Sequence, residues 1–256
     1  MVLAYETRGV GRPLVVLPWF GLDRGSAVAA FEPVFEGRPG WRRVYVDLPG
    51  TGGSPGGEPT SDAIRAAVAD LLTSFDRPVA LAGCSYGGYL AAGVARRVPG
   101  RVAGLLLVCS GVTIAAAERT LPPAPSTPPP AGWLDGIAPE LAPHLATALG
   151  NRTAEVARRV SAVVTATMTG DDEFLDRLRP AGYRLSDEDD AVRYAGPAAL
   201  LTGRQDLIAG YADQFGALEH YPDGAYAVEP EAGHYLPFEQ PAVFADLVGH
   251  WLARLP

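Results

Sequence analysis

Gly83-Cys84-Ser85-Tyr86-Gly87 places a serine among small residues, between a short apolar run and a helical pattern. The apolar run, residues 78–82, has the length of a buried strand, and residues 88–97 have the composition of a helix. A serine on a turn from a strand into a helix lies above the edge of the sheet, and small neighbours let the backbone fold closely on itself. The backbone N–H of the next residue, Tyr86, then points to where an oxyanion forms. The stretch therefore predicts that Ser85 is a nucleophile and that Tyr86 is one donor of an oxyanion hole.

A second serine has the same glycine spacing, in Gly52-Gly53-Ser54-Pro55-Gly56. Pro55 follows that serine and has no backbone N–H to offer to an oxyanion. No apolar strand precedes this copy of the pattern, and no helix start follows it. The surrounding sequence therefore favours Ser85 over Ser54.

The composition limits the partners and the chemistry. The chain has 256 residues and a net charge of −8, with basic residues clustered only in pairs, which disfavours nucleic acid and membrane as partners. All 21 basic residues are arginine, and the absence of lysine excludes Schiff-base catalysis and a Walker-type phosphate loop. We expect a small-molecule substrate, no cofactor and no metal ion. Heavy use of alanine, glycine, proline and arginine is typical of a GC-rich bacterial genome.

The compartment is inferred from the N-terminus and the cysteines. The first residues show no basic segment followed by an apolar run, so no signal peptide is expected, and no apolar stretch reaches transmembrane length. Cys84 and Cys109 lie at the ends of predicted interior strands, and we interpret them as buried reduced thiols. Cys84 is expected to pack in the core rather than to act as a second nucleophile. Together these features predict a cytoplasmic protein.

Apolar runs alternate with helical patterns along most of the chain, which predicts a mostly parallel sheet with helices on both faces. One helix is expected at residues 26–35, with Ser26 as its N-cap. The expected strands are residues 14–17, 44–46, 79–82, 102–109, 198–202 and 225–228, and the other helices are residues 61–75, 211–218 and 242–255.

The alternation is interrupted after Ser110. Residues 121–130 contain too many prolines for a helix or the interior of a strand. Residues 138–194 are polar and helical in pattern, with Thr153 and Ser186 as expected caps. We therefore predict an α/β core of residues 1–111 and 196–256, with residues 112–195 inserted as a helical cap. Such cap helices could also mediate a homodimer.

A serine needs a general base, and the four histidines allow that base to be sought by elimination. His250 falls in the terminal helix, His144 in the expected cap and His220 at a helix end. His234 stands alone in a loop directly after a predicted strand. We therefore predict that His234 is the base.

The histidine in turn needs an acid to orient it. Asp206 follows the preceding strand, and the carboxyl ends of neighbouring parallel strands meet at one edge of a sheet. The alternative role for Asp206 is to cap the next helix, and Asp213 is the nearest competitor. We predict that Asp206 orients His234.

At this point the chain resembles an α/β-hydrolase fold protein with a helical cap, over nearly its whole length. The matching motifs are Gly83-Cys84-Ser85-Tyr86-Gly87-Gly88, Asp47-Leu48-Pro49-Gly50-Thr51-Gly52, Gly203-Arg204-Gln205-Asp206 and Ala232-Gly233-His234. The resemblance implies a triad in which Ser85 is the nucleophile, His234 the base and Asp206 the acid.

The sequence departs from the family in its first catalytic loop. Where the family commonly has His-Gly, this chain has Leu17-Pro18-Trp19-Phe20-Gly21. The second oxyanion donor would be the backbone N–H of Phe20, with Trp19 as the alternative. The residues expected to line an apolar acyl pocket are Trp19, Trp133 and Met168, each of which could instead be a core residue.

The resulting hypothesis is a serine hydrolase that forms a covalent acyl-enzyme with a small or medium, largely apolar ester, thioester or related acyl compound. The alternative keeps the fold and triad for C–C bond hydrolysis, lyase or cyclase chemistry, perhydrolysis or prolyl aminopeptidase activity. In an aminopeptidase, Asp171-Asp172-Glu173 would hold the free amine of the substrate. A third hypothesis is a binding protein without catalytic activity.

Overall fold

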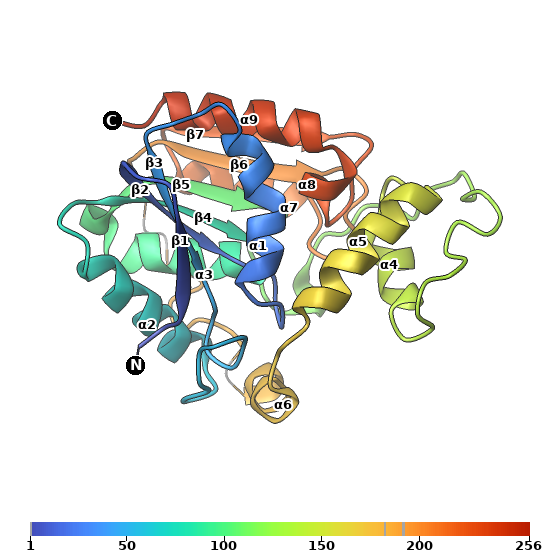
Figure 1. The fold of residues 1–256 in the computed structure, drawn as a ribbon, viewed down its shortest axis with the longest axis horizontal. Coiled ribbons are helices and arrows are strands. Elements are labelled where there is room, and N and C mark those ends of the chain that lie inside the picture. The colour runs from blue at the N-terminus through green and yellow to red at the C-terminus, as the bar shows by residue number, and fades with distance from the viewer. Residues whose placement is uncertain (1, 182, 191–192) are drawn as a thin grey trace.

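The computed structural model describes residues 2–181, 183–190 and 193–256, and a seven-stranded sheet forms its centre (Figure 1). The strands lie in the order β1-β3-β2-β4-β5-β6-β7. β1 pairs with β3 in the antiparallel sense, and every other neighbouring pair is parallel. This mostly parallel sheet confirms the predicted α/β fold class. The strands are β1 (Tyr5–Arg8), β2 (Arg12–Leu17), β3 (Trp41–Val46), β4 (Val79–Cys84), β5 (Val102–Val108), β6 (Ala198–Gly203) and β7 (Gly224–Glu229).

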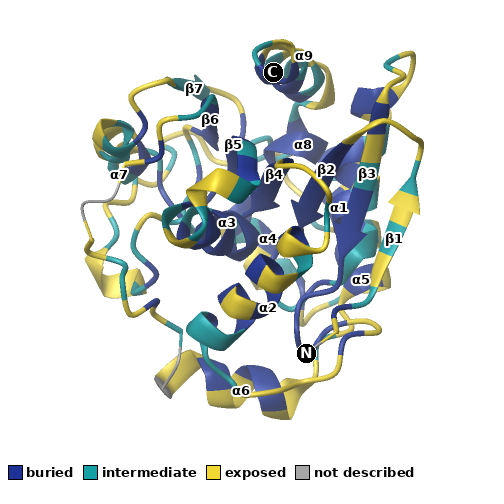
Figure 2. Ribbon diagram, turned by 90° about the vertical axis from the view of Figure 1, so that its left-hand side faces the viewer, coloured by how far each residue is buried: buried dark blue, intermediate teal, exposed yellow. Residues whose placement is uncertain are grey.

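Helices cover both faces of this sheet, because side chains of each central strand alternate between two apolar cores. On β2, Leu14 and Val16 pack in the core of α1 and α9, whereas Val15 and Leu17 pack in the core of α2 and α3. Figure 2 shows the central strands as buried and β1, at the sheet edge, as largely exposed. The principal covering helices are α1 (Arg24–Phe31), α2 (Ser61–Thr73), α3 (Tyr86–Arg97) and α9 (Pro241–Ala253).

The first helix differs from the prediction for residues 26–35. It begins at Arg24, because the carboxylate of Asp23 caps it by accepting a hydrogen bond from the backbone N–H of Gly25 at 2.8 Å. Ser26 lies inside the helix and is not its N-cap. The chain continues as a 3-10 turn over Glu32–Phe35, where Pro33 has no N–H for an α-helical hydrogen bond.

In the described part of the chain between β5 and β6, the α-helices are α4 (Ala142–Ala148), α5 (Ala154–Thr167) and α6 (Asp172–Ala181), which Figure 1 shows beyond one end of the sheet. Residues 121–130 form neither helix nor strand, as predicted. Thr153 caps α5, with its hydroxyl oxygen 3.3 Å from the nitrogen of Val156. Ser186 begins no helix, and its hydroxyl donates to Asp62 at 3.1 Å. The assignment of residues 112–195 as a cap stays a prediction.

Two further short helices are α7 (Ala212–Gly216) and α8 (Leu236–Glu239), which follow β6 and β7. Across the described residues, the structure contains no helix with both the length and the apolar character needed to cross a bilayer.

Candidate active site

Ser85 lies on the turn between β4 and α3, in a backbone conformation that is rare for a residue with a side chain. Its φ is 53°, and Cys109 is the only other non-glycine residue in the described chain with a positive φ. A Cβ atom on Gly83 would lie 2.3 Å from the carbonyl oxygen of Gly87. A Cβ atom on Gly87 would lie 2.4 Å from the carbonyl oxygen of Pro18. This crowding explains why glycine flanks the serine on both sides.

His234 connects Ser85 to Asp206 through two hydrogen bonds. Its Nε2 lies 2.8 Å from the Oγ of Ser85, and its Nδ1 lies 2.9 Å from the Oδ2 of Asp206. His234 is 3% exposed and Asp206 is fully buried, so water has little access to the second bond. The structure thus brings together the three residues that the sequence selects, and we call them the candidate triad.

The second carboxylate oxygen of Asp206 orders the turn that follows it, but it caps no helix as the alternative required, because α7 begins only at Ala212 with Tyr211 at its N-cap. It accepts hydrogen bonds from the backbone N–H groups of Ile208 at 2.8 Å and Ala209 at 2.9 Å. The competitor, Asp213, points elsewhere and accepts a hydrogen bond from the N–H of Thr120 at 2.7 Å. Asp206 therefore orders its own loop with one oxygen and contacts His234 with the other.

The remaining histidines lie outside this hydrogen-bonded chain. His220 is 3.8 Å from Glu219, and His250 is on α9. His144 is nearer, because its Nε2 lies 3.0 Å from the hydroxyl of Tyr235, the residue after His234. Burial lowers the pKa of His144, and the charge of His234 lowers it further.

The backbone N–H groups of the two residues predicted to form the oxyanion hole have no hydrogen-bond acceptor in the part of the chain that the structure describes. Tyr86 is the first residue of α3, where N–H groups lack an intrahelical partner, and Phe20 lies in the loop after β2. The N–H of Trp19, the alternative donor, is also without an acceptor. The rings of Phe20 and Tyr86 meet edge to face at 5.3 Å, which keeps the two segments together.

Ser85 and His234 line a cavity of about 340 Å³, which we call the Ser85 cavity. Phe20, Tyr86 and two of the three predicted pocket residues, Trp19 and Met168, also line it. The Trp19 side chain is 2% exposed and belongs mainly to the core, whereas Met168 is 60% exposed at the rim.

The prediction that Trp133 lines the pocket is wrong. Trp133 is 8% exposed and packs in the core cluster that includes Leu141 and Leu145 of the α4 region. It is absent from the lining of the Ser85 cavity. An apolar side chain can either line a cavity or pack in the core, and the sequence does not show toward which of these the Trp133 ring points.

The acidic residues Asp171, Asp172 and Glu173 also lie outside the lining of the Ser85 cavity. Asp171 instead caps α6 by accepting a hydrogen bond from the N–H of Phe174 at 3.1 Å, and Asp172 and Glu173 occupy the first turn of that helix. The acidic residues that were candidates for holding the free amine of an aminopeptidase substrate are therefore not part of this cavity.

Several polar groups of the cavity were not selected from the sequence, because no local pattern shows that their side chains reach the cavity. These residues are Arg119, Glu140, His144, Arg179, Tyr183 and Tyr235. Only their position in space identifies them.

Glu239 is a further residue that the sequence did not indicate. Its carboxylate is 3% exposed and accepts hydrogen bonds from the backbone N–H groups of Gly150 and Asn151 at 2.8 Å each. It accepts two more from residues on either side of His234. Burial raises the pKa of Glu239 to about 7.

The loop that carries Phe20 contacts the segment after α5. Leu22 forms an isolated antiparallel bridge with Met168, and the N–H of Asp23 donates to the carbonyl of Thr167 at 2.8 Å. The end of α5 and the residue after it therefore support the loop that carries Phe20.

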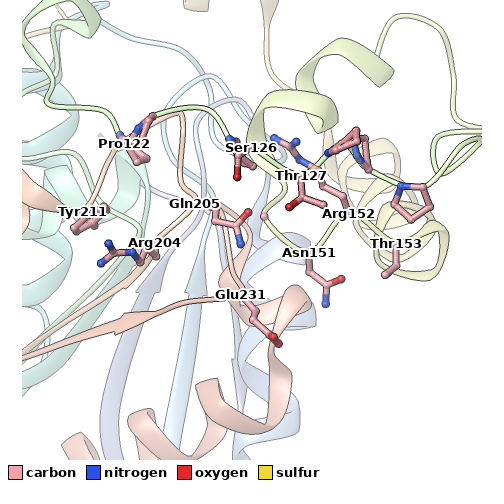
Figure 3. A pocket seen from close by; sticks show the side chains of 16 residues that line it. Pro122, Ser126, Thr127, Asn151, Arg152, Thr153, Arg204, Gln205, Tyr211 and Glu231 are labelled. Carbon is pink, nitrogen blue, oxygen red and sulfur yellow. The ribbon is translucent and has the colours of Figure 1, made fainter.

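A larger hollow of about 600 Å³ lies beside the proline-rich segment (Figure 3). Figure 3 shows this segment along one side and Arg204, Gln205 and Glu231 along the other. Neither Ser85 nor His234 lines this hollow. We therefore assign the chemistry to the smaller Ser85 cavity.

The fold and this arrangement define an α/β enzyme with a serine on a strand-to-helix turn. Residues 6–247 match the model of the alpha/beta hydrolase family, and the chain belongs to that family. A pimeloyl-[acyl-carrier protein] methyl ester esterase from Shewanella sp. (strain MR-7) is 33% identical over 117 residues. That match covers 46% of this chain and 42% of the relative, which is less than half of each protein.

Solved structures resemble the chain over almost its full length. An alpha/beta superfamily hydrolase from Oenococcus oeni PSU-1 has a TM-score of 0.84 at 23% identity, covering 98% of this chain and 96% of that one. A thermophilic esterase from Thermogutta terrifontis has a TM-score of 0.73 at 24% identity, covering 98% and 93%. At these identities the likeness establishes the fold.

Proposed function

We propose that the protein is a serine-dependent carboxylic ester hydrolase that acts on a small or medium acyl ester or thioester. The observation that carries the proposal is the hydrogen-bonded chain from Ser85 through His234 to Asp206 at the wall of one cavity. The ester chemistry of the partial relative supports the same reaction class.

In this proposal His234 accepts the proton of Ser85 as the serine oxygen attacks the ester carbonyl. The backbone N–H groups of Phe20 and Tyr86 stabilise the oxyanion that forms. His234 then donates the proton to the departing alcohol or thiol, leaving an acyl group on Ser85. Water, deprotonated by His234, releases the acid and restores the serine.

Asp206 has two tasks in this scheme. Its Oδ2 holds Nδ1 of His234 as the protonated nitrogen, so that Nε2 faces Ser85 as the acceptor. The buried carboxylate also stabilises the imidazolium that exists while the proton is on His234.

The test is labelling with a fluorophosphonate, followed by intact mass and by turnover of a panel of esters and thioesters. We expect one adduct on the wild type, none on Ser85→Ala and a much slower reaction on His234→Ala. An adduct on Ser85→Ala, or full ester turnover by that variant, would contradict the proposal. Labelling without ester or thioester turnover would redirect the search to diketones and other C–C substrates.

A further inference from the structure

The Ser85 cavity contains two arginines, although the protein as a whole has a net charge of −8. Arg119 belongs to the segment after β5, and Arg179 lies near the end of α6. Among the residues that line the cavity, Glu140 is the only carboxylate, and it is exposed. The cavity therefore carries local positive charge that the overall composition conceals.

Arg119 is held in place by neutral groups. Its Nε donates to the carbonyl of Thr113 at 3.1 Å, and its terminal nitrogens donate to the carbonyls of Ile208, at 2.8 Å, and Ile114. A guanidinium has five N–H groups, so one remains on each terminal nitrogen. Arg119 forms no ion pair with any acid in the described ranges, and its side chain is half-buried. It is thus an ordered cation without a counter-ion.

Arg179 lies beside the candidate oxyanion loop. Its guanidinium carbon is 4.8 Å from the centre of the Phe20 ring, and its one acidic contact is Asp176 on the same helix, at 3.3 Å. Exposed pairs of this kind are weak, so Arg179 remains available to a second anion.

Tyr183 lines the Ser85 cavity together with the two arginines. Its ring contacts Phe20 at 5.4 Å, and its side chain lines the Ser85 cavity. Burial raises the pKa of the Tyr183 hydroxyl, while the positive charges of Arg119 and Arg179 lower it. Tyr183, Arg119 and Arg179 line the same cavity, so this side chain adds a neutral hydroxyl donor to the two cations there.

We propose that Arg119, with Arg179 and the Tyr183 hydroxyl, binds an oxyanion group carried by the ester substrate. A carboxylate is the partner that a preordered guanidinium binds best, because two N–H groups can meet its two oxygens. The inference rests on the proposed function and refines its substrate class. The substrate is an ester that bears a free carboxylate away from the carbonyl attacked by Ser85.

The carboxylate could belong to the acyl half or to the alcohol half of the ester, and matched substrates separate these sources. The first pair is para-nitrophenyl hemi-adipate against para-nitrophenyl hexanoate. The second pair is meta-carboxyphenyl butyrate against phenyl butyrate. We expect the wild type to prefer the anionic member of one pair, as measured by kcat/KM.

Substitution of Arg119 tests the origin of this preference. Arg119→Gln should reduce the ratio of kcat/KM for the anionic to the neutral ester by about ten- to a hundredfold, as expected for losing a hydrogen bond to a charged group. Arg119→Lys, which keeps the charge, should retain part of the preference. Arg119 also contacts Ile208, so if its role were purely structural, the substitution would lower kcat/KM equally for the anionic and the neutral ester. An unchanged ratio would therefore overturn the proposal.

The contribution of Arg179 can be tested against a matched control, Arg177, on the same helix. Arg179→Gln should lower the same ratio by a smaller factor, because the side chain is 57% exposed and screened by water. Arg177 is exposed on α6 and does not line the cavity, so Arg177→Gln should leave the ratio as in the wild type. An equal effect of both substitutions would indicate general charge rather than a binding site.

Binding without turnover separates this inference from the proposed hydrolysis. Monomethyl adipate is titrated into Ser85→Ala and into Ser85→Ala/Arg119→Gln by calorimetry, with methyl hexanoate as the neutral ligand. Tighter binding of the anion that depends on Arg119 supports the subsite, even if no ester is turned over. Ser85-dependent hydrolysis without anion preference, and without Arg119-dependent binding, would overturn the subsite alone.

Discussion

Both carboxylate oxygens of Glu239 lie 3.0 Å from the backbone nitrogen of Gly233, the residue before His234. The N–H of Tyr235, directly after His234, donates to the same carboxylate at 3.1 Å. Because Gly150 and Asn151 also donate to it, one buried acid holds the histidine loop and the chain before α5 together. The position of His234 thus depends on a side chain that is not part of the candidate triad.

Glu239→Gln should remove a pH dependence of stability. The pKa of Glu239 rises to about 7 on folding, so the folded state binds the proton more tightly than the unfolded state does. The folded state therefore loses stability as the pH rises from the pKa of the unfolded state to that of the folded state. The wild type should therefore lose about 3 kcal/mol of unfolding free energy from this group between pH ~4.5 and pH ~7. Urea titrations across this range should show that loss in the wild type and in the exposed control Glu155→Gln, but not in Glu239→Gln. The same slope in Glu239→Gln would contradict the assignment.

Asp206→Asn should separate the two tasks of Asp206. The asparagine oxygen can still accept the N–H groups of Ile208 and Ala209, so the melting temperature should change little. The amide cannot hold His234 in the required tautomer as a carboxylate does, so kcat should fall by about a thousandfold or more. Steady-state kinetics on an activated ester measure this loss. Asp213→Asn is the control, and a comparable loss there would favour the competitor.

Gly87→Ala should impair the oxyanion site. The new Cβ would meet the carbonyl oxygens of Pro18 at 2.4 Å and Leu17 at 2.6 Å, and would push away the loop that carries Phe20. Loss of one oxyanion donor lowers turnover by about a hundred- to a thousandfold. Gly100→Ala is the matched control, because nothing lies within 4 Å of its added Cβ. Rates of fluorophosphonate labelling compare the two, with circular dichroism to verify folding.

Trp133 and Met168 should respond to truncation in opposite ways. Trp133→Ala leaves a hole in the core and should reduce the unfolding free energy by about 3–5 kcal/mol. Met168→Ala removes an exposed rim residue, so it should alter the preference for acyl chain length with little loss of stability. Chemical denaturation and a chain-length series of esters test both. A change of chain-length preference in a folded Trp133→Ala protein would restore its predicted pocket role.

The two thiols should be unreactive in the folded protein. Cys84 and Cys109 are free and buried, and burial raises the pKa of each, which keeps them protonated. Iodoacetamide at pH ~8 should modify neither thiol in the native state and both in denaturant, as read by intact mass. Modification of the native protein would show that one of these strand ends opens to solvent.

The sequence allows predictions for residues whose position depends on local motifs and on where the strands end. Ser85 was recognisable because its glycines, the preceding strand and the following helix all belong to one short segment. Elimination selects His234 as the candidate base, because the other histidines fall in helices or in the expected cap. Asp206 followed from the rule that parallel strands end at one edge of a sheet.

Residues that act through long-range packing were beyond such reasoning. Arg119 lies in an irregular stretch, and its role depends on carbonyls from Ile114 and Ile208, which are far apart in the chain. In the sequence Glu239 looks like any other acidic residue, and only the structure shows that four backbone N–H groups donate hydrogen bonds to it. Trp133 shows the reverse error, because apolarity alone does not distinguish a wall of a cavity from a core.

The bridge between Leu22 and Met168 limits how modular this enzyme is. A segment that only covered an active site could be exchanged between relatives as a unit, and the loops that carry the catalytic residues would not change. Here, a graft of residues 112–195 would also remove the partner of the loop that carries Phe20. Such an exchange would therefore have to keep the backbone contacts at residues 167–168, whereas residues 121–130 make no backbone hydrogen bond to the loop that carries Phe20.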